Sequence, residues 1–185
     1  MIYSLSLETA LLLIGLLLIA SHTFALVQRE KVQAWLKVFP RSSFAGIALI
    51  GIATAWFWWL VSTMDLGEFE TWRRTLKLAT PVIGVLTAMY VPEFLAVRAL
   101  GMIVLLGAEV LLEAAWMRPE GARLWLVSLV YLWLTVALFW VGMPYTMRDQ
   151  IAWISANRSR WQAASIGGIA YGAILLLSHV LIRHR

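Results

Sequence analysis

Two glutamates, Glu109 and Glu113, are the side chains best suited to chemistry, because apolar stretches surround both of them. An ionisable side chain in hydrocarbon costs about 2.5–3.5 kcal/mol on insertion scales, so each one needs a compensating role. A spacing of four residues puts both carboxyl groups on one face of a helix. This face is therefore the first candidate for a functional site.

Three interpretations of the two glutamates stay open. In the first, Glu109 is protonated or hydrogen-bonded to a neighbouring helix and serves packing. The polar face that would supply its partners consists of Ser128, Tyr131 and Thr135. In the second interpretation, the two glutamates form a proton or cation pathway. In the third, they contact another subunit.

Arg98 lies near the start of the same apolar stretch. A long arginine side chain can extend to the membrane interface while its aliphatic part stays in the apolar region, which is the interpretation that we favour. Alternatively, Arg98 binds an anionic lipid headgroup or pairs with Glu93.

His22 and His179 lie inside apolar stretches and raise the possibility of an axial haem ligand. With six spans they would lie near opposite membrane faces, roughly 16 Å apart in depth, so one iron in one protomer could not bind both. With five spans they would share a side. Binding of haem or a chlorin by one histidine stays open, although we predict no cofactor and no metal site.

Three small residues near the end of the chain, Ala164, Gly168 and Gly172, are spaced four apart. Such a stripe lets two helices approach closely in a membrane. We expect this face to pack against another helix, either within the protomer or in a second copy.

The elements that must position these residues belong to a membrane protein. Of 185 residues, 62% are hydrophobic and 14% are charged, and the mean hydropathy is +0.81. Soluble domains average about 45–50% apolar and about 25% charged residues. The sequence therefore predicts an all-α, polytopic helical bundle that forms a single transmembrane domain over residues 1–185. No basic soluble face is present that would bind nucleic acid.

A span needs about 20 mainly apolar residues. We expect six spans, which cover residues 7–27, 44–64, 76–91, 93–117, 124–141 and 164–182. The third of these is the weakest, because it is short and contains Pro81. Six spans would place both termini on one side of the membrane, whereas five would separate them.

Amphipathic segments between the spans predict short helices at the membrane surface. In Lys31–Phe39, the apolar residues recur at helical spacing between cationic ones. A similar stripe precedes the last span and consists of Met147, Ile151 and Ile154. A shorter stripe, on the opposite side of the membrane, consists of Phe69, Trp72 and Leu76. Most of the 11 tryptophans fall near predicted span ends, where the indole ring is favoured.

No nucleotide-binding loop, hydrolase motif or zinc-protease motif is present, so we lean against an enzyme. The leading hypothesis is a non-enzymatic subunit or self-assembling component of a membrane complex. The alternatives are a small proton- or ion-coupled transporter or channel that uses Glu109 and Glu113, and a b-type haem or pigment-binding redox subunit. We expect membrane lipids and a homo-oligomer or other membrane subunits as partners, in the cell (inner or plasma) membrane. The 15 Lys and Arg residues divide eight to seven between the two sides, so they orient the chain only weakly.

Overall fold

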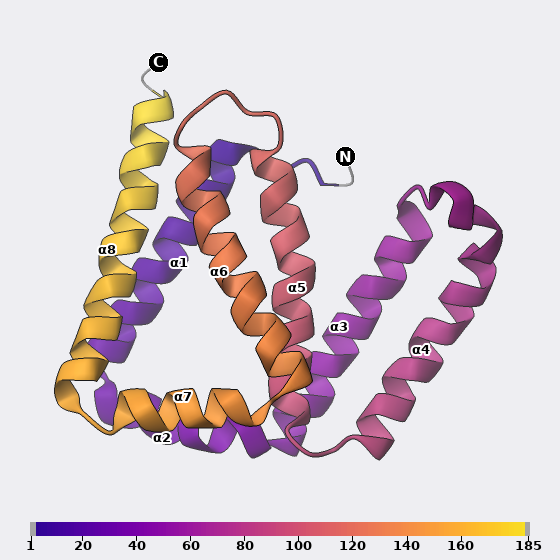
Figure 1. Cartoon of the computed structure of the whole chain (residues 1–185), viewed down its shortest axis with the longest axis horizontal. Helices are drawn as coiled ribbons and strands as arrows, with labels where there is room; N and C mark the ends of the chain where they lie inside the picture. Colours follow the sequence, from indigo (N-terminus) through magenta and orange to yellow (C-terminus); the bar gives the residue numbers. More distant parts are fainter. Residues whose placement is uncertain (1–2, 184–185) are drawn as a thin grey trace.

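A computed structural model describes residues 3–183, and within this range the chain is all-α (Figure 1). Its elements are α1 (Leu7–Val27), α2 (Arg29–Val38), η1 (Phe39–Arg41), α3 (Ser43–Thr63), η2 (Gly67–Trp72), α4 (Arg73–Tyr90), α5 (Leu95–Ala115), α6 (Arg123–Gly142), α7 (Tyr145–Ser155) and α8 (Arg158–Arg183). The side-chain oxygens of Ser6 and Ser42 accept hydrogen bonds from the first turns of α1 and α3. Such N-caps explain why these two helices begin within one residue of the predicted spans.

Among residues 3–183, five helices, and not the expected six, are long and apolar enough to cross a membrane. The candidate spans are Leu7–Val27, Ser43–Thr63, Leu95–Ala115, Arg123–Gly142 and Arg158–Ile182. The predicted span at residues 76–91 is therefore wrong. The helix at this place, α4, begins earlier than expected, and three of its first five residues are cationic: Arg73, Arg74 and Lys77. These charges make α4 an amphipathic helix.

Helix α4 nevertheless runs back along α3 and reverses the chain before α5 (Figure 1). The two helices approach each other closely at Gly84, where an added Cβ atom would meet the side chain of Thr54. The chain then turns at Phe94, which has a left-handed φ of 55°. This turn explains why α5 begins at Leu95 and not at the expected position 93.

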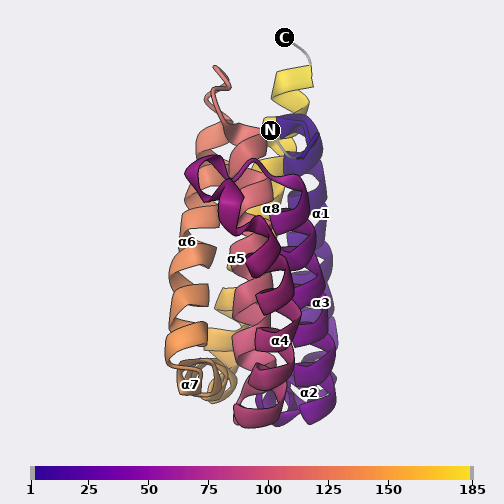
Figure 2. The ribbon, with the colours of Figure 1, turned by 90° about the vertical axis from the view of Figure 1, so that its right-hand side faces the viewer.

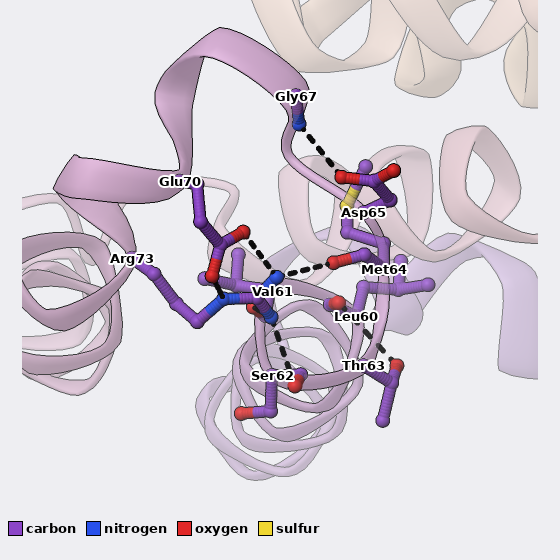
Figure 3. A network of polar contacts seen from close by, with 9 residues as sticks. All are labelled: Leu60, Val61, Ser62, Thr63, Met64, Asp65, Gly67, Glu70 and Arg73. Carbon is purple, nitrogen blue, oxygen red and sulfur yellow. Dashed lines mark hydrogen bonds and ion pairs between the residues drawn. The ribbon is translucent and has the colours of Figure 1, made fainter.

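Arg73 ties the start of α4 to the end of α3 (Figure 3). Its guanidinium group donates hydrogen bonds of 2.8–3.0 Å to the carbonyl oxygens of Val61, Ser62 and Met64. It also forms an ion pair of 2.6 Å with Glu70 in η2. The last carbonyls of a helix lack intrahelical partners, so the cation both satisfies them and opposes the helix dipole.

Among the described residues, the two long helices with the most extensive contact are α1 and α8, which run antiparallel (Figure 1). Gly172 faces Gly15 so closely that an added Cβ atom would lie 2.8 Å from the Gly15 carbonyl oxygen. Gly168 faces the ring of His22 in the same way. The third residue of the predicted stripe, Ala164, is exposed, and the buried residue at that level is Ser165. The contact thus follows a slightly different face from the predicted one, and it lies within the protomer.

The short helices α2 and α7 lie across one end of the long helices and contact each other (Figures 1 and 2). They coincide with the two longer amphipathic segments in the sequence, whereas the shorter segment lies at the other end, with Phe69 and Trp72 in η2 and Leu76 in α4. Phe39, Val97 and Met147 form a small buried cluster that joins this platform to the start of α5.

Candidate functional site

Glu109 and Glu113 lie in the second half of α5, and their surroundings differ from the predicted ones. Glu109 is six residues before the last residue of α5, which is about 9 Å along the helix axis. Glu113 is half-buried and accepts a hydrogen bond of 3.1 Å from the backbone N–H of Tyr3. The Tyr3 hydroxyl in turn accepts a bond of 2.8 Å from Nε1 of Trp56 on α3. The N-terminal segment therefore links α3 to the carboxylate face of α5.

Both carboxylates affect the pKa of Tyr3. Burial, followed by the nearby Glu109 and Glu113, raises the pKa of the Tyr3 phenol above its ordinary value. The hydrogen bond from Trp56 acts in the opposite direction. Tyr3 and Trp56 were missed in the sequence, because a tyrosine in a short segment before the first span has no periodic pattern that would place it beside a later helix.

The predicted partners on α6 do not reach the glutamates. Ser128, Tyr131 and Thr135 are all exposed. The Thr135 hydroxyl donates to the carbonyl oxygen of Tyr131 in its own helix at 2.9 Å. These three residues do share one helix face, but α6 turns that face outwards and packs on α5 through apolar residues such as Val130 and Ala137.

Glu109 is exposed, and it lines two open cavities. The first has a volume of about 370 Å³ and lies among α3, α4 and α5. Its polar lining consists of Glu109 together with Thr54, Thr80 and Thr87, and all its other lining residues are apolar. The second cavity, of about 550 Å³, lies beside α5 and reaches Leu134 of α6. Within residues 3–183, no side chain or backbone group forms a hydrogen bond or ion pair with the Glu109 carboxylate.

Arg98 lies at the other end of α5, near the platform of α2 and α7. It is half-buried, and its Nε atom is shielded from solvent without a hydrogen-bond partner in the described part of the chain. No ion pair with Glu93 is formed among these residues. Arg98 precedes Glu109 by 11 residues on α5 and lies near the opposite end of this helix. It therefore does not belong to the carboxylate site.

The two histidines contact opposite ends of the α1–α8 pair. Nδ1 of His22 donates to the Leu18 carbonyl oxygen at 2.9 Å, and Nδ1 of His179 donates to that of Glu8 at 3.0 Å. Glu8 and His22 are 14 residues apart on α1, which corresponds to about 21 Å. The two rings therefore cannot bind one haem iron within a protomer. The two histidines are kept apart by the antiparallel pairing of α1 and α8. We expected the number of spans to determine their separation.

No group of three or more His, Asp or Glu side chains that could hold a metal ion occurs among residues 3–183. A scan against protein-family models, a search of curated proteins and a search of solved structures each gave no match. The fold and its composition define the class: an all-α, multi-pass integral membrane protein with five candidate spans.

Proposed function

We propose that this chain takes up a proton or a small cation at Glu109, as a small ion-coupled transporter or channel does. The observation that supports the proposal best is that Glu109 lines two cavities, one among α3, α4 and α5 and one beside α5 and α6. A group that is reached from two cavities can accept a ligand from one of them and release it to the other.

The polar atoms of the first cavity favour a cationic ligand. The Thr80 and Thr87 hydroxyls each donate a hydrogen bond of 2.8 Å to a carbonyl oxygen of their own helix. A hydroxyl has one proton to donate but two lone pairs, so these threonines can only accept from a ligand. Together with the Glu109 carboxylate, Thr80 and Thr87 offer acceptors alone, whereas the hydroxyl of Thr54 can either donate or accept. An ionised carboxylate among apolar side chains is costly, and a proton or cation removes this cost.

Glu109→Gln tests the proposal, because the amide keeps the shape of the side chain but cannot exchange a proton. The protein is reconstituted in liposomes, and proton flux is followed with a pH-sensitive dye under an imposed pH gradient. Infrared difference spectra of the same samples report whether a carboxyl group changes its protonation state with pH. We expect Glu109→Gln to abolish the flux and to remove a titrating carboxyl band.

The matched control is Glu68→Gln, which removes an exposed carboxylate from η2, away from both cavities. The control should retain wild-type flux and the titrating band. Unchanged flux and an unchanged carboxyl band in Glu109→Gln would refute the proposal.

A second candidate function is a subunit of a membrane complex, either with other proteins or with copies of this chain. One observation favours it: α4 packs mainly on α3 and η2, and large apolar residues on α4 such as Leu78, Val82 and Met89 are exposed. A helix from a partner would cover them. Light scattering after purification in a mild detergent tests this candidate, since a lone monomer would count strongly against it.

We also propose that the protein resides in the cell (inner or plasma) membrane, with the platform of α2 and α7 on the cytoplasmic side. The support for this orientation is that eight of the 15 Lys and Arg residues lie at this end and mostly cluster in the segments around α2 and α7, because cytoplasmic loops carry an excess of Lys and Arg. Single cysteines at Lys37 and at Glu68 would lie at opposite ends. In intact cells, a membrane-impermeant thiol reagent should label only Glu68→Cys; labelling of Lys37→Cys alone would reverse the orientation.

A further inference from the structure

A polar cavity of about 410 Å³ lies where α1 passes into α2, beside the first residues of α8. Three cationic residues line it, Arg29, Lys31 and Arg158, against a single acidic one, Glu30. The lining therefore carries a net charge of +2. The volume falls within the range of about 300–1,000 Å³ that is typical of small-molecule sites.

Arg29 is the key residue of this cavity. It is half-buried, and its Nε atom is shielded from solvent without a hydrogen-bond partner in the described part of the chain. Buried N–H groups almost always have a partner in folded proteins. The planar guanidinium group is well suited to bind two oxygen atoms of one phosphate or carboxylate at the same time. An anion with several oxygens would therefore complete the site.

The position of the cavity indicates which anion fits. Its apolar side consists of Leu26, Val27 and Trp161, and Nε1 of Trp161 donates a hydrogen bond of 2.9 Å to the Ala25 carbonyl oxygen at the end of α1. Its polar side includes the first residues of α2, and the platform of α2 and α7 lies across the ends of the candidate spans (Figure 1). The cavity thus lies at the depth where lipid headgroups meet acyl chains.

We propose that this cavity binds the phosphate group of an anionic phospholipid, with Arg29 as the main ligand and Lys31 and Arg158 as supporting cations. This site is separate from Glu109, and its existence does not depend on the function that we propose for that residue. One interpretation of the sequence gave Arg98 as a headgroup ligand, and we propose Arg29 as a ligand in this cavity.

The test measures thermal unfolding and bound lipid of the whole chain in lipid nanodiscs. Discs of phosphatidylcholine alone are compared with discs that contain phosphatidylglycerol, and a third arm adds inorganic phosphate to the phosphatidylcholine discs. Native mass spectrometry counts the phosphatidylglycerol molecules that stay bound. We expect phosphatidylglycerol to raise the unfolding temperature, and Arg29→Gln to weaken this binding by about tenfold or more, because hydrogen bonds to charged groups are strong.

Two further variants keep the result unambiguous. Arg29→Lys retains the charge but not the two-pronged geometry, and Arg158→Gln changes an exposed residue, so both should fold even if Arg29→Gln does not. Both should weaken phosphatidylglycerol binding. The control is Arg148→Gln, which removes an exposed cation that is already paired with Asp149 and should leave binding unchanged. A response to inorganic phosphate alone, equal binding of both lipids, or equal loss in the Arg148→Gln control would each overturn the proposal.

Discussion

Gly172→Ala should separate α1 from α8 and destabilise the protein. The new Cβ atom would lie 2.8 Å from the Gly15 carbonyl oxygen and 2.8 Å from Cγ1 of Ile19. The Ile19 side chain can rotate away, but the backbone oxygen can move only if α1 moves. Overpacking of this kind costs about 1–3 kcal/mol.

The matched control is Gly167→Ala in the same helix, where nothing lies within 4 Å of the added Cβ atom. Both substitutions replace a helical glycine by alanine and so share the gain in helix propensity, which is at most about 1 kcal/mol. The difference between the two variants therefore isolates the clash. We expect Gly172→Ala to be less stable than the control by about 1–3 kcal/mol. A difference of about 1.4 kcal/mol corresponds to about tenfold in the unfolding equilibrium constant.

The assay is equilibrium unfolding in mixed micelles of a mild detergent and dodecyl sulfate, followed by circular dichroism. If Gly172→Ala and Gly167→Ala unfold at the same dodecyl sulfate fraction, then α1 and α8 do not meet backbone to backbone, and the pairing described above is refuted.

Two further predictions concern the ends of the fold. The Arg73 guanidinium holds the pKa of the Glu70 carboxyl below its usual value, so the stabilisation from this pair is present at neutral pH and is lost as the pH falls below the ordinary carboxyl range. Spin labels at Ile52→Cys and Val82→Cys should show a broader α3–α4 distance distribution in acid. The Glu70→Gln variant should show an equally broad distribution at neutral pH. A distribution in this variant as narrow as that of wild type would contradict the prediction. Tyr3→Phe removes the acceptor of the Trp56 indole N–H and should cost about 1 kcal/mol. Because the pKa of Tyr3 is raised, its neutral form stabilises the fold below about pH 10, and this contribution is lost at higher pH; equal alkaline destabilisation of wild type and Tyr3→Phe would exclude it.

The number of spans shows what a local pattern can miss. The mainly apolar stretch from position 76 to 91 has almost the length of a span, but helix α4, which contains all but its last residue, begins three residues earlier, at Arg73. The side chain of Arg73 caps the last carbonyls of α3, which is a contact between two elements. A pattern along one segment does not reveal such a contact.

The sequence alone determined membrane residence and the approximate bounds of the five apolar helices, because these depend on the length of each apolar run. The segment at residues 7–27 agrees with α1 at both ends. The tertiary structure decided which face of each helix meets which neighbour. Lipid-facing and helix-facing positions are equally apolar in a membrane protein, so hydrophobicity does not distinguish them. For this reason the Glu109 face was visible in the sequence, whereas its neighbours Tyr3 and Thr80 were not.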